Sequence, residues 1–217
     1  PAYDLTMQAR SGIMSMTGEK GRPPVKVGVA WIDVMTGMTA TSAILAALFE
    51  RQKSGHGSIL DISLWDVALA SMVNQAHNVF CGQEPVPMGS SHPNLVPYRV
   101  FEAKDGWFAL GIGSDEQWNT LCERVDLPSN PTYATNKGRI FHRNDVEQLV
   151  QNALAKFTRA ELEQMLEGLP CSPVNSLREA LSDEHSATRQ MTETVQGVQT
   201  LSSVFRHCLI QNEKSDV

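Results

Sequence analysis

The stretch 25-VKVGVAWIDVMTG-37 joins an extended segment to the start of a helix. Its first eight residues are mostly apolar, and we expect a short buried strand there, although Lys26 interrupts the run. From Val34 onward, apolar and small residues recur at intervals of three, four and seven, which predicts a helix. Gly55 is the expected end of this helix. Asp33 therefore falls where an extended run gives way to a helix.

The following residues repeat this order of elements. Residues 58–64 alternate between apolar and polar side chains, as in a half-buried strand, and a second helix is expected over about 65–80. A strand–helix–strand–helix order predicts a parallel sheet with helices on its faces. Two strands cannot bury two helices, so we expect further strands from other sequence or from another chain. We therefore predict that residues 1–81 form part of a larger α/β domain with a parallel sheet.

A change of composition separates this part from the rest. Residues 81–97 are rich in Gly, Pro, Ser and Asn, which is typical of a boundary or a functional loop. Beyond them, two β-rich runs flank an Asp-Gly pair at 105–106, which predicts a hairpin. Helix starts are expected at four capping boxes: Ser114/Gln117, Asn144/Glu147, Thr158/Glu161 and Ser176/Glu179.

The predicted fold class is α/β, with a partial parallel-sheet domain, which the family resemblance given below implies to be Rossmann-like, and a smaller α/β domain. The smaller domain is expected to span residues 82–168. Residues 169–217 are then a connector that returns to the large domain.

The overall composition limits the classes of function. The 217 residues are 41% apolar and carry a net charge of −6 with acids and bases interspersed, which argues against nucleic acid as the main partner. No unbroken apolar run of about 20 residues is present, so we expect no membrane span. The four Cys and six His show no ligand spacing, so we expect no metal site and a cytoplasmic location. The chain opens on Pro1 without a secretory pattern, and we interpret it as a fragment.

A collinear series of short motifs identifies a family. The motifs of the first block are Tyr3-Asp4-Leu5, Gln8-Ala9, Thr17-Gly18, Pro23-Pro24-Val25, Val27-Gly28-Val29-Ala30, Asp33 and Gly37. Those of the second block are Ser91-His92-Pro93-Asn94, Pro97-Tyr98, Asp105-Gly106 and Pro173-Val174-Asn175. Together they resemble the family III CoA-transferases, also called the CaiB/BaiF family, over about residues 2–185. The N-terminal part of that family is absent, and residues 207–217 do not follow its pattern.

Two interpretations of Asp33 follow from these observations. By local sequence alone, it is a helix N-cap whose carboxylate accepts a backbone N–H of the first turn. The resemblance implies instead that Asp33 is the catalytic nucleophile of a CoA-transferase. A carboxylate can attack an acyl-CoA thioester, and N–H groups at a helix N-terminus can stabilise the oxyanion that forms. The family mechanism passes through an aspartyl anhydride and an aspartyl-CoA thioester.

The resemblance also implies the partners of the reaction. Ala2, Tyr3, Asp4 and Gln8 are expected to contact coenzyme A, and the loop Gly89-Ser90-Ser91-His92 is expected to cover the substrate. Without the resemblance, Tyr3 would be ordinary packing and the loop a plain surface turn. The substrates are an acyl-CoA and a small carboxylic acid, with no tightly bound cofactor, and relatives form interlocked homodimers.

Two alternatives remain open. An α-methylacyl-CoA racemase resembles this family and uses a His with an Asp, but Tyr3 stands where that His would be, and a phenol exchanges protons poorly near neutrality. The other alternative is a non-catalytic truncated paralogue. The phosphates of CoA require cations, and only Arg10, Lys20, Arg22 and Lys26 lie near the motif.

Overall fold

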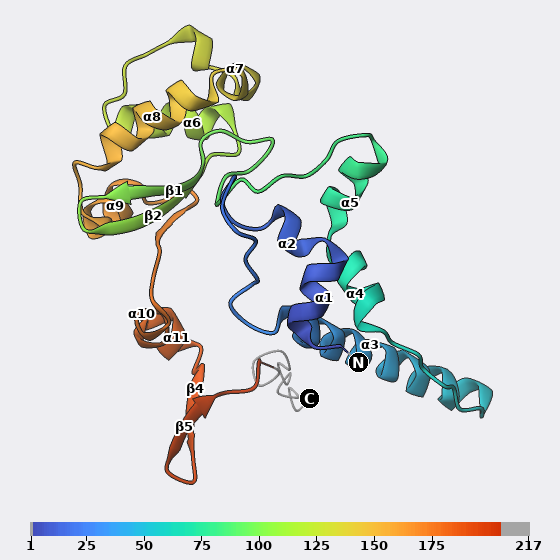
Figure 1. Cartoon of the computed structure of the whole chain (residues 1–217). Helices are drawn as coiled ribbons and strands as arrows, with labels where there is room; N and C mark the ends of the chain where they lie inside the picture. Colours follow the sequence, from blue (N-terminus) through green and yellow to red (C-terminus); the bar gives the residue numbers. More distant parts are fainter. Residues whose placement is uncertain (1, 205–217) are drawn as a thin grey trace, which may run out of the picture. The chain divides into compact units, whose positions relative to one another are not determined.

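The computed structural model describes residues 2–204, and its contacts divide the chain into two compact units, Pro1–Arg99 and Val100–Val217 (Figure 1). The helices of the first unit are α1 (Asp4–Ser11), α2 (Ile13–Met16), α3 (Trp31–Ser54), α4 (Leu64–Ala70) and α5 (Val73–Phe80). The Gly- and Pro-rich residues 82–97, which we expected to begin the second domain, group with the first unit.

Helix α3 confirms the predicted helix and its end. Gly55 adopts a left-handed conformation, with φ of 76°, and donates its N–H to the carbonyl of Arg51 at 2.9 Å. A left-handed glycine at this position is a common helix terminator. The helix begins at Trp31, with Ala30 as its N-cap, so Asp33 lies inside the first turn. The prediction that Asp33 is the N-cap is wrong.

The two strands expected in this unit, at residues 25–32 and 58–64, are not formed in the part of the chain that the structure describes. A strand needs a neighbour for its backbone N–H and C=O groups. The backbone N–H of Val27 is instead bound by the side chain of Gln8. The helix predicted over 65–80 is divided into α4 and α5, with the break at residues 71–72.

The core of the first unit is small. Ile13, Ile32 and Ala68 are buried together, and four partly buried side chains pack against them: Met7, Met16, Leu64 and Met72. Almost all of α3 lies outside this core, since only 6% of its most apolar 18-residue window is buried. By length and composition this helix could cross a membrane, which differs from our expectation. A core helix of a larger soluble protein passes the same test.

The second unit contains a three-stranded sheet with the order β1-β2-β3 among the described residues. Strands β1 (Tyr98–Ala103) and β2 (Gly106–Gly111) confirm the predicted hairpin. Strand β3 (Cys171–Pro173) pairs antiparallel with β2, with Ala109 opposite Ser172. This third strand comes from the segment that we expected to be a connector. A separate antiparallel hairpin consists of β4 (Thr192–Val195) and β5 (Val198–Leu201).

Three helices of the second unit begin where the capping boxes predict. The helices of this unit are α6 (Asp115–Arg124), the short 3₁₀ helix η1 (Pro131–Tyr133), α7 (Asn136–Phe141), α8 (Arg143–Leu154), α9 (Arg159–Met165), α10 (Leu177–Ser182) and α11 (Glu184–Thr188). The boxes at Ser114, Thr158 and Ser176 are confirmed. The fourth is wrong, because α8 begins at Arg143 and Glu147 accepts a hydrogen bond from Arg143 Nη1 at 3.1 Å.

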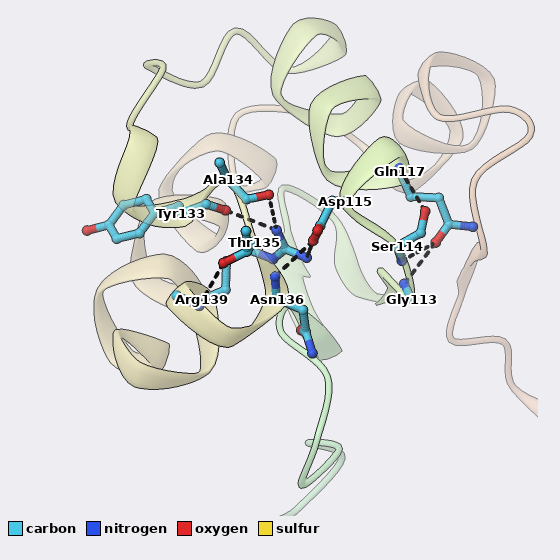
Figure 2. A network of polar contacts seen from close by, with 10 residues as sticks. Gly113, Ser114, Asp115, Gln117, Tyr133, Ala134, Thr135, Asn136 and Arg139 are labelled. Atoms are coloured by element: carbon cyan, nitrogen blue, oxygen red, sulfur yellow. Dashed lines mark hydrogen bonds and ion pairs between the residues drawn. The ribbon is translucent and has the colours of Figure 1, made fainter.

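A buried arginine holds the first part of this unit together (Figure 2). Arg139 is fully buried, and its Nη1 donates to the carbonyls of Tyr133 and Ala134 at 2.9 and 3.2 Å. Its Nη2 donates to Asp115 Oδ1 at 2.9 Å. The guanidinium also lies over the ring of Trp118, 5.2 Å from its centroid. Arg139 therefore joins η1 and α7 to the start of α6.

Candidate active site

Asp33 is an exposed carboxylate on the first turn of α3. Its helix has 24 residues, and the backbone N–H groups at the start of a helix attract negative charge. The preceding residue, Ile32, is fully buried in the core of the unit. The buried Ile32 therefore anchors the backbone at this point, while the side chain of Asp33 is exposed to solvent.

The start of α3 is held by a residue far away in the sequence. Ala30, the N-cap, has no side-chain acceptor, and Asp4 on α1 instead accepts a backbone N–H of the first turn of α3. Asp4 Oδ1 accepts the backbone N–H of Ile32 at 2.8 Å. Asp4 Oδ2 accepts a hydrogen bond from Gln8 Nε2 at 2.6 Å, and Gln8 Oε1 accepts the N–H of Val27 at 2.9 Å. Two buried side chains thus connect α1 to the loop before Asp33 and to the helix itself.

The four residues expected to contact CoA fall into two classes. Ala2 and Tyr3 are exposed, and 84% of Tyr3 is accessible, so both are available to a ligand. Asp4 and Gln8 are only 8% and 0% exposed, and their side chains are engaged within the protein. Whether any of the four contacts CoA stays a prediction.

The expected substrate loop is hydrogen-bonded to the turn that follows α2. Gly89 donates its backbone N–H to the carbonyl of Gly18 at 2.7 Å and has a φ of 60°. The carboxylate of Glu19 lies so close to its Cα that a methyl group there would overlap it. Further along the loop, the rings of His92 and Tyr98 are 5.1 Å apart. Contacts of this loop thus reach residues 18–19 at one end and Tyr98 at the other, and its role as a lid stays a prediction.

The cations near the motif are all exposed. Lys20, Arg22 and Lys26 lie on the loop between α2 and α3, and Lys26 Nζ donates to the carbonyl of Val27 at 2.9 Å. Arg10 lies over the ring of Trp65, 5.6 Å from its centroid. Lysine and arginine side chains of this kind can meet phosphate groups without first breaking a buried ion pair.

One feature near the site had no signal in the sequence. A groove of about 490 Å³ runs between α3 and α4, lined on one side by Trp31 and Met35 and on the other by Asp66 and Val67. Its lining residues come from segments about 30 positions apart, so no local motif indicates it. Among the described residues, no cluster of three or more His, Cys, Asp or Glu could hold a metal ion.

Several known proteins are similar to this chain over most of its length. The chain is 37% identical to a succinate–glutarate CoA-transferase from Agrobacterium fabrum over 193 residues, which are 86% of this chain and 48% of the relative. It is 32% identical to the human succinyl-CoA:glutarate CoA-transferase, covering 83% of this chain and 43% of the relative. An acetyl-CoA:oxalate CoA-transferase from Acetobacter aceti is 31% identical, with coverage of 88% and 51%. The chain spans about half the length of these relatives.

Solved structures extend the comparison to the fold. A CaiB/BaiF family protein from Brucella suis has a TM-score of 0.81 and 33% identity, covering 94% of this chain and 55% of that one. A Mycobacterium tuberculosis protein has a TM-score of 0.82 at 21% identity, which shows likeness of fold alone. The sequence model of CoA-transferase family III matches residues 1–213. The chain belongs to CoA-transferase family III.

Proposed function

We propose that this chain carries the acyl-accepting aspartate of a CoA-transferase that moves CoA from an acyl-CoA to a carboxylic acid. The observation that carries the proposal is the position of Asp33. Its carboxylate is exposed on the first turn of a 24-residue helix whose start is fixed by the buried Asp4 and Ile32. The relatives named above are CoA-transferases whose names include succinyl-CoA, glutarate, acetyl-CoA and oxalate.

The proposed reaction has four balanced steps. Asp33 attacks the carbonyl of the donor thioester, which gives a mixed anhydride and CoA thiolate. The thiolate attacks the Asp33 carbonyl, releasing the donor acid and leaving an aspartyl-CoA thioester. The acceptor carboxylate attacks this thioester, which gives a second anhydride and frees the thiolate again. The thiolate then attacks the acceptor carbonyl, giving the new acyl-CoA and free Asp33.

The surroundings of Asp33 support this chemistry. Lys20, Arg22 and Lys26 precede α3 and offer positive charge to the phosphates of CoA on a chain with a net charge of −6. Tyr3 is exposed one residue away from Asp4, so its phenol can reach a ligand while Asp4 holds α3. In this proposal Ala2 and Tyr3 face the CoA, and residues 89–92 cover the acid.

The proposed partner of the chain is a second copy in an interlocked homodimer in the cytoplasm. The support is the apolar surface of α3, where Met38, Leu45 and Phe49 are each more than 60% exposed. Large exposed apolar patches are typical of interaction surfaces. A monomeric mass by light scattering, at a concentration of about 50 μM protein, would contradict this part of the proposal.

The test of the function is to trap the intermediate. Incubation with succinyl-CoA or acetyl-CoA, followed by hydroxylamine and mass spectrometry, should give a hydroxamate on Asp33. An Asp33→Asn variant should lose both the adduct and transfer, and an Asp61→Asn variant, at an exposed site, should keep both. Transfer at the normal rate by Asp33→Asn would overturn the proposal.

A further inference from the structure

Asp4 and Gln8 form a single buried hydrogen-bond chain between two backbone amides. It runs from the N–H of Val27 to Gln8, from Gln8 to Asp4, and from Asp4 to the N–H of Ile32. We infer that these two residues are positioning residues for Asp33, and that their side chains do not contact CoA. This inference rests on the proposed role of Asp33.

The order of donors and acceptors along this hydrogen-bond chain explains why an aspartate and a glutamine are needed. Both ends are N–H donors, so the two side chains between them must together present three acceptors and one donor. An aspartate carboxylate supplies two acceptors, and a glutamine supplies one acceptor and one donor. In Asp4→Asn, only two acceptors remain for the same donors. Two N–H groups would therefore face one another somewhere between Val27 and Ile32, whichever way the side-chain amides at positions 4 and 8 are rotated. Gln8→Glu would bring two carboxylates together where the structure has a bond of 2.6 Å.

Ile32, the residue before Asp33, is fixed in two ways. The backbone N–H of Ile32 is bound by Asp4, and its side chain is fully buried against Ile13 and Ala68. Ala30 offers no cap of its own, so Asp4 satisfies an amide that the local sequence leaves open. The position of the Asp33 backbone therefore depends on Asp4, while its carboxylate stays free to react.

The burial of Asp4 and Gln8 supports a positioning role for their side chains and argues against contact with CoA. Asp4 is 8% exposed and Gln8 is fully buried, so CoA could reach them only by displacing the bonds that hold α3. Both oxygens of Asp4 and both polar atoms of Gln8 already have partners. Tyr3 is exposed beside them and leaves the ligand a contact on the same segment.

The test is an exchange of the two functional groups. In the double variant Asp4→Asn/Gln8→Glu, the amide introduced at position 4 can accept from the N–H of Ile32 and donate to the carboxylate introduced at position 8. That carboxylate can also accept from the N–H of Val27, so every bond is restored. Each single change should lower kcat for CoA transfer about 10- to 100-fold, since a displaced nucleophile loses its alignment. The KM for acyl-CoA should change less than about twofold, and the double variant should recover most of the lost kcat.

The matched control is Gln52→Glu with Asp61→Asn, both at exposed sites, which should leave kcat unchanged. Hydrogen exchange of the backbone amides gives a second readout that needs no catalysis. Each single variant at position 4 or 8 should speed exchange at residues 27 and 32, and the double variant should restore protection.

Two results would overturn the inference: a double variant without rescue in kcat and in exchange, or single variants that raise only the KM for acyl-CoA. If the wild-type protein formed no adduct on Asp33, the proposed function would fail. The exchange data would still decide whether the pair fixes the start of α3.

Discussion

Replacing Arg139 by methionine should destabilise the second unit by about 3 kcal/mol. The side chain is fully buried, and methionine fills most of its volume but donates no hydrogen bonds. The carbonyls of Tyr133 and Ala134 lose their donor, at roughly 1 kcal/mol each, taken at the low end because Ala134 is an exposed residue. Loss of the contact with the Trp118 ring adds about 1 kcal/mol. Asp115 adds little because its side chain is 51% exposed and regains water.

The assay is urea unfolding followed by tryptophan fluorescence, in a background with Trp31 and Trp65 replaced by phenylalanine so that Trp107 and Trp118 report on the second unit. With a typical slope for a small unit, the loss should lower the midpoint by about 1–2 M urea. Arg124→Met is the matched control. Arg124 also donates to two carbonyls, those of Met165 and Glu167, but it is exposed, so its removal should cost within about 1 kcal/mol. Equal losses for the two variants would refute the reasoning that burial decides the cost.

Three further predictions concern the second unit and the thiols. Gly138→Ala should destabilise by at least about 1–3 kcal/mol in the same urea assay, because a methyl group there overlaps the backbone oxygen of Thr132; unchanged stability would contradict the contact. Burial raises the pKa of the Cys122 thiol to about 11, so its alkylation rate at pH 8 should be low. The rate should rise about tenfold per pH unit until the pH reaches this pKa. Cys81 is exposed and should react before Cys122. Ser114→Ala removes the acceptor for the N–H of Gln117 and should cost about 1 kcal/mol of unfolding free energy by thermal melting, and no change in Tm would contradict the cap.

Sequence patterns predicted the elements whose causes are local. The capping boxes at Ser114, Thr158 and Ser176 and the end of α3 at Gly55 depend on residues within four positions of one another. The hairpin of β1 and β2 follows from Asp105-Gly106 in the same way. The box at Asn144 was wrong because α8 already begins at Arg143, so Asn144 lies inside the helix, and Glu147 accepts a hydrogen bond from Arg143, four residues away.

The elements that were mispredicted depend on distant partners. Residues 25–32 have the composition of a buried strand, but no strand lies beside them in the part of the chain that the structure describes, and Val27 bonds to Gln8 instead. Strand β3 has only three residues, too few for a period to be detected, and it is defined by its pairing with β2. Periodicity records which face of a segment is apolar, and it does not record what covers that face.

The candidate site shows the same division between local and distant causes. The family motifs indicated Asp33, and the local rule made it the cap of its own helix. The N-cap is Ala30, whose side chain cannot accept a hydrogen bond, and the acceptor comes instead from Asp4, 28 residues earlier in the chain than Ile32. A helix start without a capping side chain requires an acceptor from elsewhere, and here that acceptor comes from the motif that the resemblance assigns to CoA binding. Because both oxygens of Asp4 are engaged in hydrogen bonds, Asp4 fixes the start of α3, and the carboxylate of Asp33 in the first turn stays exposed.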